Sequence, residues 1–596
     1  MESDEDLFRR LEQLNEIGAA LSQEKNIDRL LEKILLAAKA ITHAAGGTLY
    51  VLEDSDEDDE GPRLRFAIMR NEALGIAMGG TTGNSIPFYP IHLRGKDGRP
   101  NNQMVAAYAA LTGKTVNIAD AYSQEGFDFS GTRNFDKKTG YHSKAFLTVP
   151  MKNHESEIIG VLQLINRMEP GTNEVRSFSP SDQRLAESLS SQAAIALTNR
   201  QLINQLEVLF ESFIALINAA IDGKSPYTGG HCQRVPVLTM MLAEAVNETH
   251  DGPLHEFRMT DKDRYELKIA GMLHDCGKVT TPEYVVDKAT KLETLYDRIH
   301  EIRTRFEVLK RDAEIDCLKA ICAGGDAPKL RADLAAELKT LDEEFAFVAA
   351  CNEGGEFMAP EKVARLKAIA ARTWRRTLDD RLGVSRDEGE RIAKRPAAPL
   401  PATESLLADK PEHVIERGAQ DQMPEDNRWG FKVKVPRHLY NRGEIYNLSI
   451  ARGTLTEEER YKINDHMAQT IIMLTKLPFP KHLESVPELA GGHHEKMDGT
   501  GYPKRLLGGT MSVPARVMAI ADIFEALTAS DRPYKKAKTL SEALEIMARM
   551  KKEKHIDPDL FDVFVRKKVY LRYAEQFLDR DQIDEVDESR IPGFAP

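Results

Sequence analysis

Residues 493–503 read His-His-Glu-Lys-Met-Asp-Gly-Thr-Gly-Tyr-Pro, and this string decides how the C-terminal half of the chain is interpreted. Two adjacent imidazoles open it, and the glycines and proline that follow are typical of a tight loop. A second string, Leu-His-Asp-Cys-Gly-Lys at 273–278, follows an apolar helical stretch. There, an imidazole and a carboxylate at one helix end can bind the same cation, and the carboxylate can bridge to a second. Together the two strings indicate a metal centre built on helices.

Further candidate ligands are spread along the chain. One histidine follows Gly229-Gly230, another lies in a helical pattern that begins near Thr456, and an aspartate follows the apolar run 517–521. The full set is His231, His274, Asp275, His466, His493, His494 and Asp522. Imidazoles and carboxylates from separate helices can hold two divalent ions and leave positions open for water and substrate. A single buried histidine is more often a hydrogen-bonded core residue, so the argument depends on the whole set.

Composition limits the class of protein. The 596 residues predict about four domain-sized units, and 41% hydrophobic with 29% charged residues is typical of a globular chain. No apolar run approaches the ~18 residues of a membrane span. The acidic N-terminus is unlike a secretory signal. We therefore expect a cytoplasmic protein with no membrane partner. The net charge of −13 argues against a nucleic-acid partner, and five scattered cysteines predict reduced thiols.

The N-terminal part of the chain predicts an α+β domain. Apolar residues recur at helical spacing over residues 7–41, and β-rich runs follow at 47–52, 63–68, 145–149 and 158–165. From Leu202 to Ala220 the apolar residues alternate at spacings of three and four. That spacing favours a parallel coiled coil about as strongly as an amphipathic helix packed on its own domain. The coiled coil would make the protein a homodimer.

A second helical block interrupts the chain between the two histidine strings. Heptad-spaced apolar residues over 292–313, then a stripe over 334–348, flank a Gly-Gly-Asp break and predict a helical hairpin. Prolines scattered over 394–437 predict a loop or extended segment.

The two histidine strings resemble the HD-GYP branch of the HD phosphohydrolase superfamily, over roughly residues 205–287 and 445–575. The resemblance implies an all-helical domain that uses iron or manganese to hydrolyse cyclic di-GMP to the linear dinucleotide or GMP. It implies one ion on His231, His274, Asp275 and Asp522, and a second on His466, His493 and His494, with Asp275 bridging. It also implies catalytic roles for Asp275 and Lys278, and phosphate-binding roles for Lys278, Arg532 and Lys535. Some members place a glutamate for a third ion where this chain has Tyr227, so we expect two ions.

The N-terminal domain resembles a GAF domain over roughly residues 10–190, on the strings at 135–141, 159–167 and 178–183. It leans towards the cyclic-nucleotide-binding type of phosphodiesterases and adenylyl cyclases. The signature of that group is Asn-Lys, then Phe, then Asp-Glu. This chain has Asn-Arg, Phe and Asp-Gln at those positions, so the Arg and the Gln depart from it. The resemblance implies a cyclic nucleotide as the GAF ligand and a ligand region at Asp136, Thr139, Asn166, Arg167, Phe178 and Asp182.

The prediction is therefore a multidomain chain, an α+β GAF domain followed by an all-α HD-type phosphohydrolase domain with a helical insertion. Its segments are a GAF sensor with an N-terminal helix (1–190), a helical coiled-coil connector (191–224), an HD-GYP catalytic domain (205–287 and 445–580) and the hairpin and Pro-rich insertion (288–444). GAF ligand binding is expected to regulate hydrolysis. A signalling partner is expected at the Gly501-Tyr502-Pro503 loop or the insertion. Two alternatives stay open: 3′,3′-cyclic GMP-AMP or another cyclic nucleotide as substrate, and a catalytically silent module that senses or docks partners.

Overall fold

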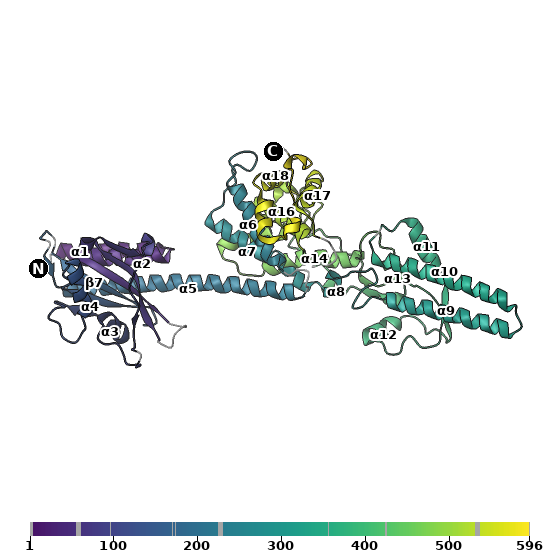
Figure 1. The fold of residues 1–596 in the computed structure, drawn as a ribbon, viewed down its shortest axis with the longest axis horizontal. Helices are drawn as coiled ribbons and strands as arrows, with labels where there is room; N and C mark the ends of the chain where they lie inside the picture. The colour runs from purple at the N-terminus through teal and green to yellow at the C-terminus, as the bar shows by residue number, and fades with distance from the viewer. Residues whose placement is uncertain are drawn as a thin grey trace. The chain divides into compact units, whose positions relative to one another are not determined.

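The computed structural model describes residues 4–54, 61–95, 97–169, 171–172, 174–224, 230–355, 357–423, 426–530 and 537–594. The chain divides into two compact units, Met1–Phe210 and Glu211–Pro596 (Figure 1). Among the described residues, no helix is both long enough and apolar enough to cross a bilayer.

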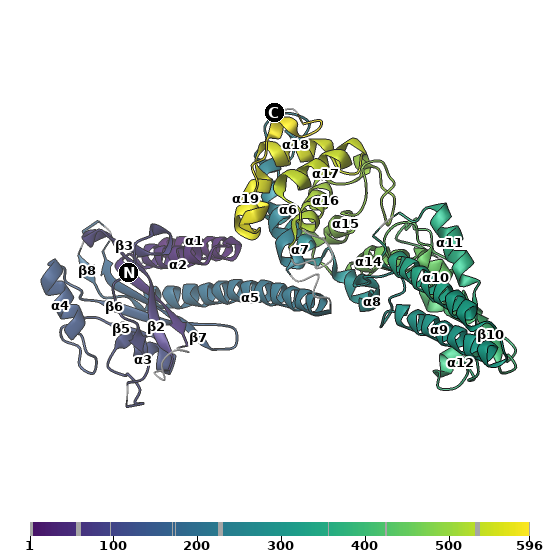
Figure 2. The ribbon, with the colours of Figure 1, turned by 45° about the vertical axis from the view of Figure 1, so that its right-hand side comes forward.

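The first unit is built on one antiparallel sheet (Figure 2). Its centre is β1 (Ala44–Glu53), β2 (Arg63–Asn71), β6 (Phe146–Lys152) and β7 (Ile158–Met168), which match the four predicted β-rich runs. The strand order is β3-β2-β1-β7-β6-β5, with β3 (Ile76–Gly79) and β5 (Val116–Ile118) at the edges. The short strands β4 (Ile91–His92) and β8 (Val175–Arg176) pair with β2 and β7. The α+β class predicted for this part of the chain is confirmed.

Helices cover the sheet. α1 (Asp4–Gln23), α2 (Ile27–Thr42) and the start of α5 (Pro180–Lys224) pack together on sheet residues such as Leu49 and Leu162 to form the main core. α2 begins where the Asn26 side chain accepts a hydrogen bond from the Arg29 N–H, an N-cap that satisfies a free donor of the first turn. α3 (Val105–Thr112) packs with two smaller clusters of the sheet's side chains, and α4 (Ser130–Thr139) begins directly after Phe129, a member of one of them.

α5 continues as a single helix from the first unit to Lys224, and the predicted connector (191–224) lies entirely within it. Its apolar stripe is exposed: Leu202, Leu206, Leu209, Phe213 and Leu216 are between 45% and 65% exposed. Exposed leucines at coiled-coil spacing indicate a surface that a partner helix can bury.

The second unit contains the helices that carry the histidines. α6 (His231–Asn247), α7 (Asp261–Leu273), α14 (Glu457–Leu474), α15 (Val486–Gly491) and α16 (Val513–Thr528) surround the site, and α17 (Leu540–Lys552), α18 (Pro558–Arg566) and α19 (Val569–Phe577) complete the bundle. Both α7 and α14 start at a capping box, formed by Thr260 with Asp263 and by Thr456 with Glu459.

The residues between the two halves of this bundle have a core of their own. α8 (Glu283–Val286) leads to α9 (Ile299–Cys322) and α10 (Ala327–Glu353), which pack along each other and against α11 (Pro360–Ala370). α12 (Arg386–Ile392) follows. The Pro-rich stretch, predicted as a loop or extended segment, consists of loops with short strands and turns of helix. It contributes to two small sheets, β9 (Thr373–Arg376) with β10 (Ala402–Ser405), and β11 (Val414–Glu416) with β12 (His438–Asn441).

A buried ion pair fixes this block to the bundle. The Nζ of Lys288 donates to both carboxylate oxygens of Glu459, at 2.9 and 2.8 Å, and the Lys288 side chain is 1% exposed. Lys291 donates to the carbonyl oxygens of Leu448 and Ile450, at the end of α13 (Glu444–Leu448) and just beyond it. Two lysines buried with such partners hold the insertion in a defined position on α13 and α14.

Candidate metal centre

The seven predicted metal ligands converge in the second unit as two adjacent groups. The first contains His231 at the start of α6 and the His274-Asp275 pair after α7; the second contains His466 of α14 and the His493-His494 pair after α15. Within each group, one ligand atom from each residue lies within 4.8 Å of the others. Asp522 of α16 joins the first group, because its Oδ1 lies 3.3 Å from the Nε2 of His231.

Asp275 lies between the two groups. Its Oδ2 is 3.1 Å from the Nε2 of His231 and 3.2 Å from the Nε2 of His274. Its other oxygen, Oδ1, is 3.2 Å from the Nε2 of His466. Each carboxylate oxygen therefore faces one group, which is the arrangement that a bridging ligand of two cations requires.

Backbone carbonyls orient three of the imidazoles. In His274, His466 and His493, the Nδ1 contacts the carbonyl oxygen of the residue three positions earlier, at 2.7, 2.5 and 2.7 Å. A carbonyl only accepts, so Nδ1 carries the proton in each ring. The Nε2 then keeps its lone pair and points into the group, as a metal-binding imidazole must.

Unsatisfied buried atoms indicate that this donor set fits metal ions. The Oδ1 of Asp275 and the Nε2 atoms of His466 and His493 are buried without a hydrogen-bond partner, although buried polar atoms are normally paired. Burial, with the nearby His274, lowers the pKa of His493 to about 4, and burial with His493 lowers the pKa of His494 further below its usual value. Both rings are therefore neutral at pH 7 and available as ligands. Imidazole with carboxylate suits iron, manganese, nickel or zinc.

A residue that the sequence analysis missed orients His231. The Nδ1 of His231 lies 2.5 Å from the Oε2 of Glu525, and Arg234 donates to the other oxygen of Glu525 at 2.8 Å. Although burial opposes ionisation, His231 and Arg234 keep the pKa of Glu525 below its usual value. The signal was present in the sequence: Glu525 lies three residues after Asp522, on the same face of α16.

Of the three predicted phosphate-binding residues, the structure describes Lys278 only. Its Nζ is 2.5 Å from the Oδ2 of Asp275, and its side chain is 26% exposed, so the ammonium group lies at the centre and still reaches solvent. Arg532, Lys535 and the third-metal position Tyr227 lie outside the described residues.

The loop after the histidine pair forms a wall of the second group. The Tyr502 ring stacks on His494, with centroids 4.9 Å apart and planes 17° apart. Gly501 packs so closely on the backbone that a Cβ would lie 2.5 Å from the Cα of Glu495, hence only glycine fits. Gly501 and Pro503 are buried, so the part of this loop that a protein partner could reach is further along, at the exposed Arg505 and Leu507.

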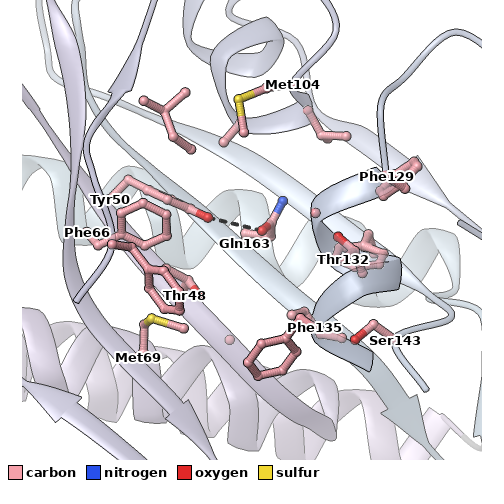
Figure 3. A pocket seen from close by; sticks show the side chains of 18 of the residues that line it. Thr48, Tyr50, Phe66, Met69, Met104, Phe129, Thr132, Phe135, Ser143 and Gln163 are labelled. Carbon is pink, nitrogen blue, oxygen red and sulfur yellow. Dashed lines mark hydrogen bonds between the residues drawn. The ribbon is translucent and has the colours of Figure 1, made fainter. Parts of the chain in front are cut away.

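The first unit contains a separate cavity of about 650 Å³ (Figure 3). Its walls come from sheet residues such as Tyr50, Phe66 and Gln163, and from Phe129 and Phe135 at α4. These residues are far apart in the sequence, and the sequence analysis did not single out the cavity.

None of the six residues predicted as the GAF ligand region lines this cavity; the described lining does not include Asp136, Thr139, Asn166, Arg167, Phe178 or Asp182. Asp136 instead accepts hydrogen bonds from the N–H and hydroxyl of Ser143, and Asn166 accepts from the N–H groups of residues 144 and 145. Asp182 is held by Arg10 and Arg167. Asp136 and Asn166 thus position the segment 141–145, which forms part of the cavity wall.

Comparison with known proteins gives the same organisation. A GAF domain model matches residues 26–197, and two HD domain models match residues 228–343 and 401–560. A 3′3′-cGAMP-specific phosphodiesterase of Vibrio cholerae is 34% identical over 146 residues, 23% of this chain and 33% of that one. A cyclic di-GMP phosphodiesterase of Pseudomonas aeruginosa is 46% identical over 135 residues, 23% of this chain and 29% of that one.

Among solved structures, the GAF domain of an Acinetobacter phosphoenolpyruvate-protein phosphotransferase covers 33% of this chain and 98% of its own, at 15% identity and a TM-score of 0.24. The chain spans about a third or less of the curated relatives quoted above. The chain thus joins a GAF domain to an HD domain that carries the HD-GYP motif, as predicted.

Proposed function

We propose that the HD domain hydrolyses a phosphodiester bond of cyclic di-GMP, releasing the linear dinucleotide and/or GMP. The observation that carries the proposal is Asp275, whose two oxygens face two separate histidine groups. Two metal positions that share one carboxylate are the arrangement that enzymes use to stabilise both the attacking and the leaving oxygen in phosphodiester hydrolysis. The names of the two bacterial relatives, both cyclic dinucleotide phosphodiesterases, support it.

The centre would hold two divalent ions, iron or manganese, on the seven residues predicted. Two such ions would activate a water molecule as the nucleophile and neutralise charge on the phosphodiester. This chain's own residues then bind and orient. Lys278 supplies a cation for a non-bridging phosphate oxygen, and Arg532 and Lys535 are proposed to do the same. Tyr502 fixes the plane of His494.

A second substrate is 3′,3′-cyclic GMP-AMP. The Vibrio cholerae relative is named as specific for it and is 34% identical to this chain over 146 residues. The two substrates share the phosphodiester and differ in one base, so the same centre would cleave both, and base contacts would set the preference.

Regulation and assembly complete the proposal. Ligand binding in the GAF domain would change hydrolysis, and two chains would pair through the exposed stripe of α5 as a cytoplasmic homodimer. Residues 288–444 would be an insertion between the two halves of the catalytic domain, with a surface for a signalling partner.

The test is anaerobic turnover of cyclic di-GMP by protein loaded separately with ferrous or manganous ions, with products resolved by ion exchange. Linear dinucleotide or GMP is expected from the wild type and absent from the His274→Ala/Asp275→Ala variant. His482→Ala, an exposed histidine of the same unit, is the control and should keep full activity. Cleavage by the double variant would show that the site is wrong. If protein containing two ions cleaves only cyclic GMP-AMP, the second substrate is correct, and if it cleaves neither, the enzymatic proposal fails.

A further inference from the structure

The cavity of the first unit has aromatic walls on two sides (Figure 3). On the strand side, the Tyr50 and Phe66 rings lie 4.8 Å apart between centroids, and Phe66 and Phe88 lie 5.4 Å apart. On the other side, Phe129 and Phe146 lie 5.4 Å apart. Aromatic rings on both sides suit the faces of a planar ring, which gains stacking as well as burial.

The charged residues of the lining, among the described part of the chain, are not arranged for an anion. Arg70 is buried, but its guanidinium is 2.5 Å from the carboxylate of Glu32 and also donates to backbone carbonyls. Arg94 is exposed at the rim and donates to a backbone carbonyl of its own loop. Asp128 places a carboxylate at the start of α4, and its hydrogen bonds with Ser130 lower its pKa, so it stays ionised. Asp128 is exposed, and the buried Arg70 already pairs with Glu32, so a buried phosphate would compete with that carboxylate for its cation, which is costly.

A neutral hydrogen-bonding group lies between the walls. The Gln163 Oε1 accepts a hydrogen bond from the Tyr50 hydroxyl at 3.3 Å, and its Nε2 donates to the Thr148 hydroxyl at 3.1 Å. Burial raises the pKa of Tyr50, so that hydroxyl remains a neutral donor. A carboxamide has two N–H groups and two acceptor lone pairs, so one donor and one acceptor of Gln163 remain for a ligand.

We propose that this cavity binds a planar, uncharged ring compound, with its faces between the aromatic walls and a carbonyl or ring nitrogen on the Gln163 amide. The volume of about 650 Å³ is within the usual range of small-molecule sites. This ligand takes the place of the cyclic nucleotide expected from the sequence, because the buried arginine among the described lining residues, Arg70, is already paired with Glu32. The proposal names the ligand class for the regulation proposed above, but binding itself does not depend on hydrolysis.

The experiment uses two uncharged planar probes and the full, metal-free chain. Lumichrome offers carbonyls and ring nitrogens, whereas 1-aminoanthracene offers rings with a single amine; both are followed by fluorescence. Each should bind saturably at one per chain. Phe66→Ala should weaken both probes by about tenfold, because it removes a stacking wall. Gln163→Met keeps the size of the side chain and should weaken lumichrome by about tenfold while 1-aminoanthracene is little changed.

The matched control is Gln183→Met, because this amide donates to Glu187 and does not line the cavity, and it should bind both probes like the wild type. Thermal unfolding of each variant confirms that it is folded, and either cavity variant alone is sufficient for the test. Displacement of a probe by stoichiometric cyclic AMP or cyclic GMP would overturn the uncharged ligand class. No saturable binding, or binding unchanged in both cavity variants, would overturn the cavity as the site. Neither result bears on the phosphodiesterase proposal, which is tested by turnover.

Discussion

Replacing Glu525 by glutamine should weaken one of the two proposed metal sites and spare the other. The carboxylate of Glu525 is fully buried and contacts the Nδ1 of His231, whose Nε2 faces the first ligand group. A carboxylate behind a metal-binding imidazole raises its basicity and fixes its orientation. Glutamine has nearly the same shape but no charge, so the fold should be kept while this support is lost.

The expected loss of metal affinity follows from other residues that, like Glu525, hydrogen-bond to a metal ligand. Loss of one typically weakens metal affinity by about 10- to 100-fold, or about 1.4–2.8 kcal/mol. In this structure Arg234 would also lose the negative charge of Glu525, its ion-pair partner, which places the effect towards the upper end. Among the described residues, the side chain of Glu525 contacts His231 and Arg234 and not the second ligand group, which should keep its affinity.

The assay is a manganese titration of metal-free protein, with free Mn²⁺ measured by electron paramagnetic resonance. The wild type should bind two ions. In Glu525→Gln one of the two affinities should fall and the other remain. Glu244→Gln is the control, because Glu244 is also an arginine-paired glutamate of this unit, held by Arg264. Two unchanged affinities in a folded Glu525→Gln variant, or an equal loss at both sites, would refute the reasoning.

Three further predictions concern stability and assembly. Removing bound ions with a chelator should lower the unfolding temperature, because an ion at 100 times its dissociation constant stabilises by about 2.7 kcal/mol; calorimetry should detect no such change in the double variant of the turnover assay. Lys288→Met should lower the free energy of unfolding by about 3–5 kcal/mol in urea titrations, because it leaves Glu459 buried without its cation. Adding Glu459→Gln should recover much of this loss. An unchanged free energy of unfolding in Lys288→Met would contradict the role given to the buried pair. Leu206→Glu combined with Leu216→Glu should convert a dimer to monomers, as measured by light scattering. Val208→Glu, equally exposed but outside the apolar stripe of α5, should leave the dimer intact. A monomeric wild type would contradict the coiled-coil prediction.

The sequence was sufficient to predict which residues gather at the metal centre, because histidine pairs and His-Asp strings are rare and chemically specific. The resemblance also implied that Asp275 bridges the two ions, and the structure has one oxygen of Asp275 facing each group. What the sequence could not give is the packing of α14 against the segment after α7 that produces this arrangement. Glu525 was within reach of sequence analysis through its spacing from Asp522. A glutamate on an apolar helix face can equally pair with an arginine, however, and here Glu525 does both.

The cavity of the first unit was beyond sequence analysis for a physical reason. Its walls are aromatic and aliphatic residues from separate strands and helices, and each of them alone is indistinguishable from an ordinary core residue. Apart from Phe178, the signature residues that could be recognised are polar, and in the structure Asp136 and Asn166 accept hydrogen bonds from backbone N–H groups. Asn166, for example, has a φ of 55° and ties down the segment that leads into β6. The domain could therefore be recognised from a few residues in the sequence, whereas its cavity could be found only from the packing of the folded chain.

The two ligand groups differ in charge, and this difference indicates where the substrate would bind. A divalent ion in the first group would face Asp275, Asp522 and an imidazole backed by Glu525, so its charge is largely neutralised. An ion in the second group would face neutral imidazoles and one oxygen of Asp275. The Lys278 ammonium group, beside the Oδ2 of Asp275, adds positive charge on the side of the first group. A phosphodiester that lies across both positions, with a non-bridging oxygen near Lys278, would therefore meet positive charge at each of them.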